Sequence, residues 1–346
     1  SDIPTLLLDG RVNEVPDPVA TAANLRKQIQ NHDWPELLLY MHDEPGWRQF
    51  EELTPYLTRW KKVPQIRTVT AMNSQPSYGL GYLHDVWIVR NDEITPELLR
   101  ESQRLGAEVW TYAIDLCFSN PLANRYYAGL YTWAFDLGGN HPWAYHDTPT
   151  SFLKEDGTPN EFASLGYVLP SKDGPIPSVG WEGRREGVDD YRYLQLLETV
   201  LASAPPGNAT VKMAQAWLVD LKGQIGWNFY LGNTVGDRRD MDFHNPAPQL
   251  AADEYDAVRE KATDYILKLE SVVSKPLSPL KRKVPRPIVG KYEPADYLEQ
   301  SIEACVEALS SSSVADRRAA ARALTLRGPE AALAVERLAE LVEDED

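Results

Sequence analysis

Two adjacent carboxylates, Asp43 and Glu44, stand where an apolar run ends in the segment ELLLYMHDEPGW, residues 36–47. One protonated and one ionised carboxyl group in the same site can carry acid–base chemistry. Neighbouring residues of an extended strand point to opposite faces, so these two acids can share a site only if the strand breaks beside them. Pro45 and Gly46 follow at once and favour such a break.

Two other interpretations of this segment stay open. Asp43 could begin a helix as its N-cap, with the next two residues in a first turn stabilised by the helix dipole. A metal site would instead use His42 and Asp43 with His84 or His146. No two histidines have the i, i+4 spacing of a helical zinc site. We therefore expect no metal and no other cofactor.

Short apolar runs alternate with helix-like stretches over the first 147 residues, with few hairpin signals. This alternation predicts an α/β fold of parallel strands with crossover helices. It fits a (β/α)8 TIM-type barrel that lacks its N-terminal strands, and it also fits an open doubly wound sheet, although no G-x-G-x-x-G follows a strand. We expect strands at residues 5–10, 36–43, 66–72, 85–89, 108–114 and 141–147, and helices at residues 17–32, 47–62, 95–106 and 122–139.

The C-terminal half reads as helical after a turn-rich stretch up to residue 180. We expect helices at residues 182–202, 209–227 and 253–273. The chain then divides into three parts: a barrel with C-terminal helices (1–273), a Pro-rich linker (274–294) and a HEAT-like repeat (295–346).

The expected HEAT-like repeat is one pair of helices. A single pair of this type cannot bury its own core and normally stacks on neighbours, which suggests protein contacts through the tail and a chain cut from a longer array. The residues expected to face each other in the pair are Ala319, Ala320, Ala323 and Leu324 on one helix and Val335, Leu338 and Leu341 on the other.

Composition excludes several classes of function. The formal charge of −16 argues against a general nucleic-acid binder, which needs a basic surface. No run approaches the roughly 18 apolar residues that span a bilayer. Cys117 and Cys305 are the only two cysteines and are distant in sequence, so they offer neither a disulfide framework nor a thiolate metal site. The 10 Trp and 17 Tyr against 7 Phe suit either a sugar-binding cleft or a large core and its rim.

Four segments in order resemble the catalytic domain of glycoside hydrolase family 123 (also called domain of unknown function 4091). The likeness covers residues 6–201, and its segments are YMHDEPG, EVWTYAIDLCFSNP, RYYAGLYTWAFDLGGNHPWAY and PSVGWEGRREGVDDYRYLQLLE. The resemblance implies a β/α barrel in an exported bacterial protein. It also implies a glycan substrate and a retaining β-N-acetylgalactosaminidase activity. A full barrel needs about two more strand–helix units before residue 6, so we expect the chain to be a fragment.

The resemblance assigns a role to each acid. The substrate's own 2-acetamido oxygen attacks the anomeric carbon, which is the exception to the rule of two carboxylates. Asp43 would orient the acetamido N–H and stabilise the oxazolinium charge. Glu44 would protonate the leaving oxygen and then activate water. We expect Asp43 to be ionised and Glu44 to be protonated, which burial and the neighbouring charge favour.

Residues near later strand ends are candidates for binding the sugar. Of the aromatic candidates, Trp110 and Tyr112 could instead belong to the core. The polar candidates Asn73, Asp115 and His146 could instead cap loops. Trp87 is expected to pack inside. Arg184, Arg185 and Glu186 could bridge to the site, and we expect them instead to form ion pairs at a helix start. The candidate substrate-binding residues are Trp110, Tyr112, Trp143, Tyr145, Asn73, Asp115 and His146.

Two rival functions stay open. In a two-carboxylate double displacement, Glu44 would be the acid and Asp115 or Asp147 the nucleophile, with the carboxyl groups about 5–5.5 Å apart. The second rival is a non-catalytic carbohydrate-binding or scaffold protein, which the HEAT-like tail and the absent strands suggest.

Overall fold

The computed structural model describes most of the chain, and its residues group into two compact units. The first unit comes from residues 1–88, 97–108 and 284–346, and the second from residues 89–96 and 109–283. The described residues are 5–9, 17–32, 34, 36–61, 63, 66–72, 79–91, 94, 96–113, 121–142, 166–169, 171–225, 252–273, 300–313, 316–317, 320–321, 323–324 and 328–341.

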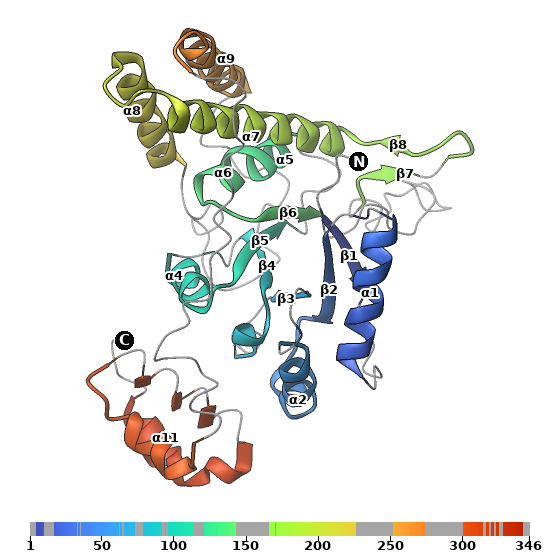
Figure 1. Cartoon of the computed structure of the whole chain (residues 1–346), viewed down its shortest axis with the longest axis vertical. Coiled ribbons are helices and arrows are strands. Elements are labelled where there is room, and N and C mark those ends of the chain that lie inside the picture. The colour runs from blue at the N-terminus through green and yellow to red at the C-terminus, as the bar shows by residue number, and fades with distance from the viewer. Residues whose placement is uncertain are drawn as a thin grey trace, which may run out of the picture. The chain divides into compact units, whose positions relative to one another are not determined.

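A six-stranded sheet runs in chain order from β1 to β6 (Figure 1). The pairs β1–β2, β2–β3 and β5–β6 are parallel, which confirms the predicted α/β fold. A doubly wound sheet reverses its strand order at one point, and this sheet does not. The strands are β1 (Thr5–Asp9), β2 (Glu36–Asp43), β3 (Arg67–Met72), β4 (Val86–Arg90), β5 (Glu108–Ala113) and β6 (Gly139–Pro142).

Two helices of the first unit, α1 and α2, share a core cluster with β2. Asp17 caps α1, because its carboxylate accepts from the N–H groups of Val19 (3.0 Å) and Ala20 (3.1 Å). Gly106 ends α4 with a φ of 70°, a conformation that suits glycine. One core cluster joins Ala22 of α1, Leu39 and Met41 of β2, and Leu53, Leu57 and Trp60 of α2. The helical elements are α1 (Pro18–His32), η1 (Trp47–Gln49), α2 (Phe50–Lys61), η2 (Gly81–Leu83) and α4 (Pro96–Leu105).

The second unit contains a helix that the sequence pattern did not describe correctly. Instead of one α-helix over residues 122–139, a five-residue π-helical segment, η4, lies between two short α-helices. The hydroxyl of Thr132 also donates to the carbonyl of Tyr127, five residues back, at 2.6 Å. A π-helix is wider than an α-helix because its backbone bonds span five residues instead of four. Asp136, with a φ of 53°, then turns the chain toward β6. The elements here are α5 (Pro121–Tyr126), η4 (Tyr127–Tyr131) and α6 (Thr132–Ala134).

Three longer helices complete the second unit, at about the predicted places (Figure 1). They are α7 (Val179–Ser203), α8 (Ala209–Gln224) and α9 (Ala252–Leu269). A small antiparallel pair, β7 (Val168–Leu169) with β8 (Ile176–Pro177), lies in the stretch expected to be rich in turns. None of the helices in the described part of the chain is both long and apolar enough to cross a membrane.

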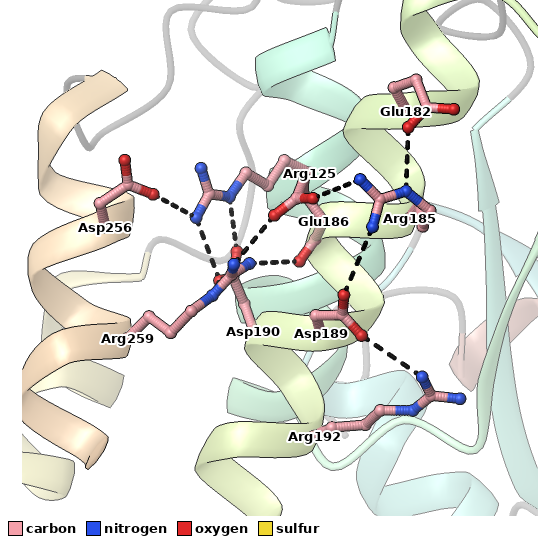
Figure 2. Close-up of polar contacts among 9 residues, drawn as sticks. All are labelled: Arg125, Glu182, Arg185, Glu186, Asp189, Asp190, Arg192, Asp256 and Arg259. Atoms are coloured by element: carbon pink, nitrogen blue, oxygen red, sulfur yellow. Dashed lines mark hydrogen bonds and ion pairs between the residues drawn. The ribbon is translucent and has the colours of Figure 1, made fainter.

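Ion pairs hold α7 to α5 and α9 (Figure 2). The buried carboxylate of Asp190 accepts from Arg125 of α5 (2.7 and 3.1 Å) and from Arg259 of α9 (2.8 Å). Arg259 also reaches the Glu186 carboxylate at 2.9 Å. The expected ion-pair role of Arg185 and Glu186 is confirmed, since Arg185 bonds Glu186 at 2.6 Å.

Glycines let the backbones of α7 and α5 approach closely. A Cβ atom at Gly183 would lie 2.1 Å from the carbonyl oxygen of Pro121, and one at Gly187 would lie 2.4 Å from that of Arg125. Real Cβ atoms do not come so near to backbone, and neither helix can shift without breaking the ion pairs across it. The glycines of the segment WEGRREG are therefore packing residues.

Gly183→Ala should lower the free energy of unfolding by about 3 kcal/mol or more. The added methyl group would collide with the backbone of Pro121, which cannot move aside as a flexible side chain could. Denaturant unfolding followed by far-UV circular dichroism would measure this change. Gly223→Ala in α8 is the matched control, since nothing lies within 4 Å of its Cβ position. The control substitution should raise the free energy of unfolding by about 0.4–1 kcal/mol. Equal effects of the two changes would contradict this packing.

The C-terminal region forms its own apolar cluster. Cys305, Ala320, Ala323 and Leu324 are buried in it, and Leu338 and Leu341 pack against it. The expectation for Val335 was wrong: its side chain is 61% exposed, because the cluster contacts Ala334, one residue earlier on the helix. Residue 319 and the expected linker lie outside the described residues. The elements are α11 (Ile302–Ala308), η7 (Gly328–Ala334) and α13 (Val335–Glu340).

Candidate functional site

The carboxyl end of β2 contains a β-bulge. Tyr40 pairs with Val69 of β3, but His42 pairs with the very next residue, Thr70, so Met41 is an extra residue on β2. The Met41 side chain is fully buried in the core, and the Thr70 hydroxyl donates to the carbonyl of His42 at 2.6 Å. Because of the extra residue, the side chains that follow Met41 point to the faces opposite those of a regular strand.

The chain turns sharply at Glu44, one residue earlier than the Pro–Gly pair suggested. Glu44 has a φ of 46°, in the left-handed region that costs a residue with a Cβ roughly 1–2 kcal/mol. Its N–H still donates to the carbonyl of Ala71 at 3.1 Å, so the pairing with β3 holds the strained residue in place. Strain of this kind gathers at functional sites.

Both acidic side chains reach solvent. The alternative of Asp43 as an N-cap is wrong, because Asp43 ends β2 and the next helical turn starts only at Trp47. The expected burial of Glu44 is also wrong, because its side chain is exposed at the turn. The bulge and the left-handed turn together let two adjacent acids emerge at one end of a strand.

Two side chains that the sequence did not single out hold this segment. The phenolic hydroxyl of Tyr40 donates to Oδ1 of Asp43 at 2.7 Å. The amide oxygen of Gln49 accepts from the N–H of Gly46 at 2.7 Å, and its amide nitrogen lies 3.1 Å from Nε2 of His42. No sequence signal marks these pairs, since regular strand geometry places residues 40 and 43 on opposite faces.

The His42 ring therefore helps to hold the turn after β2, through its contact with Gln49. When Gln49 donates to its Nε2, the ring proton is on Nδ1. Within the described part of the chain, no three His, Cys, Asp or Glu side chains gather as a metal site would need. The alternative of a metal held by His42, Asp43 and His84 thus finds no support there, and His146 lies outside the described residues.

His84 is buried in the first unit at 1% exposure, just before β4. Neither of its ring nitrogens has a hydrogen-bond partner in the structure. Burial lowers the pKa of His84 from 6.5 to about 3, with the Asp85 charge opposing this and those of Lys61 and His42 adding to it. The ring is therefore neutral in the folded protein near neutral pH.

Acid should destabilise the protein through His84. The unfolded chain takes up this proton below pH 6.5 and the folded chain only near pH 3, so stability is lost as the pH falls through this window. The loss should be about 1.4 kcal/mol per pH unit for this group. Denaturant unfolding at pH 7 and pH 5 would measure it. His84→Asn should show a smaller loss between the two pH values, and an equal loss would contradict this assignment.

The sugar-binding candidates on β5 belong to the second unit. Tyr112 is buried at 4% exposure. Trp110 is partly buried and packs across the sheet on Gly139 of β6, where an added Cβ would lie 3.0 Å from its ring. These environments are those of sheet packing, the alternative stated for both residues. The other candidates lie outside the described residues: Asn73, Asp115, Trp143, Tyr145 and His146.

Two further expectations concern Trp87 and Arg184. The prediction that Trp87 packs inside is confirmed: it is 1% exposed and its indole N–H donates to the carbonyl of Gly81 at 2.9 Å. Arg184 contacts a strand, whereas Arg185 pairs with acids of its own helix. Arg184 donates to both the side-chain and the backbone oxygen of Asn140 on β6, and its guanidinium lies 5.7 Å from the Tyr167 ring.

The sequence matches one known protein family. The family model described as the glycoside hydrolase 123 catalytic domain matches residues 21–197, which include Asp43 and Glu44. A search of curated proteins finds no match. One similar solved structure is a family 123 glycoside hydrolase from Clostridium perfringens, studied for glycolipid glycan hydrolysis. The identity is 12% and the TM-score 0.45, over 72% of this chain and 44% of that one.

The chain thus spans less than half the length of that solved structure. The family model, in contrast, covers more than half of the 346 residues and takes in all four segments that carry the resemblance, apart from the last residue of the fourth. By this match, the chain belongs to glycoside hydrolase family 123, a family of glycosidases.

Proposed function

We propose that the protein is a retaining β-N-acetylhexosaminidase, with β-N-acetylgalactosaminides as its substrates and the 2-acetamido group as the nucleophile. The observation that carries the proposal is the emergence of Asp43 and Glu44 side by side from the end of β2. Membership of family 123 supports the reaction class. The sequential order of six strands supports a (β/α)8 barrel, in which strand ends of this kind line the catalytic mouth.

The adjacency of the acids fits substrate assistance better than double displacement. In a double displacement, the nucleophile and the acid flank the scissile bond from opposite sides of the sugar. When the acetamido oxygen is the nucleophile, neither carboxyl group needs to attack, and both can approach from one strand end. The rival mechanism would need Asp115 or Asp147 as nucleophile, and both lie outside the described residues.

In the proposed mechanism, each acid has its own role. The Asp43 carboxylate accepts the acetamido N–H, aims the acetamido oxygen at the anomeric carbon and stabilises the positive charge of the oxazolinium. The Glu44 carboxyl group gives its proton to the leaving oxygen as the glycosidic bond breaks. It then takes a proton from the water that opens the oxazolinium ring. Each of the two steps inverts the anomeric carbon, so its configuration is retained overall. Because Glu44 is exposed, the bound sugar itself must exclude water from it.

Hydrolysis of 4-nitrophenyl β-N-acetylgalactosaminide, its gluco epimer and its α-anomer tests the proposal. Turnover of the β-galacto substrate, with slower turnover of the epimer and none of the α-anomer, would support it. A folded protein that cleaves none of the three would contradict it, and preference for the gluco epimer would contradict the substrate assignment.

A further inference from the structure

The bulge in β2 brings together two side chains that a regular strand would keep apart. In an unbroken strand, residues 40 and 43 point to opposite faces. The extra residue at Met41 reverses this, and the Tyr40 hydroxyl donates to Oδ1 of Asp43 at 2.7 Å. We propose that Tyr40 is a positioning residue that acts through Asp43, an inference that rests on the proposed function for the role of Asp43.

The contact decides how the carboxylate is presented. A hydroxyl bonded to an ionised carboxylate makes a charge-assisted hydrogen bond, which is short and directional. With Oδ1 held by Tyr40, Asp43 turns Oδ2 toward the acetamido N–H of a bound sugar. An exposed carboxylate without this bond would rotate freely, and each turnover would have to order it again.

The backbone of the bulge does not depend on the Tyr40 hydroxyl. Met41 is buried in the core, His42 contacts Gln49, and the Thr70 hydroxyl bonds the carbonyl of His42. These three contacts hold the strand end without the Tyr40 hydroxyl. Tyr40→Phe should therefore keep the fold and remove only the bond to Asp43.

Steady-state kinetics on 4-nitrophenyl β-N-acetylgalactosaminide test the inference. Tyr40→Phe should lower kcat roughly 10- to 100-fold with little change in KM, as expected for the loss of a hydrogen bond to a charged group. In an Asp43→Asn background, the same change should have almost no further effect. The matched control is Tyr82→Phe, a partly buried tyrosine at the core of the same unit, which should leave kcat unchanged. Equal losses in both backgrounds, or no loss from Tyr40→Phe, would overturn the inference.

A second measurement does not depend on activity. In protein labelled with carbon-13 in its aspartate carboxyl groups, the Asp43 signal is the one missing from Asp43→Asn. Tyr40→Phe should shift this signal at neutral pH, and Tyr82→Phe should not. An unchanged signal would refute the hydrogen bond itself. A shifted signal in a protein that cleaves no glycoside would instead refute the proposed function, and with it the catalytic part of this inference.

Discussion

Glu44→Gln is expected to reduce kcat/KM about 10²- to 10⁴-fold on a β-N-acetylgalactosaminide with a poor leaving group, such as an alkyl glycoside. The amide of glutamine keeps the shape of the side chain but cannot give up a proton to the leaving oxygen. A 4-nitrophenolate departs without much protonation, so the loss in kcat/KM on the aryl substrate should be much smaller. Kinetics on both substrates would measure the difference.

Asp43→Asn is the matched control for Glu44→Gln, because it makes the same chemical change at the neighbouring residue. It removes the charge that stabilises the oxazolinium, which forms whatever the leaving group. Its loss should therefore be similar on the alkyl and the aryl glycosides. If Glu44→Gln also affected both substrates equally, Glu44 would not be the general acid.

Asp190→Ala should lower the free energy of unfolding by about 3–5 kcal/mol, the usual cost of removing one partner of a buried ion pair. Asp190 is 2% exposed and bonds the guanidinium groups of Arg125 and Arg259 (Figure 2). Burial alone would lower the pKa of Arg125, but Asp190 and Asp256 raise it above its ordinary value, so it stays charged. Without Asp190, two cations on α5 and α9 would face each other with one counter-charge fewer. Denaturant unfolding would measure the change.

Asp189→Ala on the same helix is the control for Asp190→Ala. Its carboxylate pairs with Arg185 (3.7 Å) and Arg192 (3.3 Å), whose side chains are exposed. Exposed pairs of this kind contribute about 0–1 kcal/mol. A loss at Asp189 as large as that at Asp190 would show that burial is not what makes the Asp190 pairs important.

The sequence predicted most of the fold, because the apolar runs mark buried strands directly. The run of residues 36–43 coincides with β2, and the order of runs became the order of strands. The π-helical segment η4 was missed for a physical reason. Over about 15 residues, hydrophobic periodicity barely separates an α-helix from one with a single wider turn. The contact between the hydroxyl of Thr132 and the carbonyl of Tyr127 within this turn has no signature in the sequence.

The candidate site was predicted only in part. Asp43 and Glu44 could be identified because they follow an apolar run and because the segments that resemble family 123 contain them. Tyr40 and Gln49 could not, since their contacts depend on a bulge that arises from the register of β2 against β3. The break of the strand was likewise expected at Pro45 and Gly46, the residue types that usually break a strand, whereas the left-handed turn is at Glu44.

The measurement that tests the central claim most directly is the dependence of rate on the nucleophilicity of the acetamido group. The substrates would be 4-nitrophenyl β-galactosaminides whose N-acetyl group has no, one, two or three fluorine atoms. Each fluorine withdraws electrons from the acetamido oxygen while changing its size little. If that oxygen attacks the anomeric carbon, kcat/KM should fall steeply with each fluorine, and Asp43→Asn should flatten the trend. A rate that does not depend on fluorine in the unaltered protein would contradict substrate assistance and favour an enzyme nucleophile.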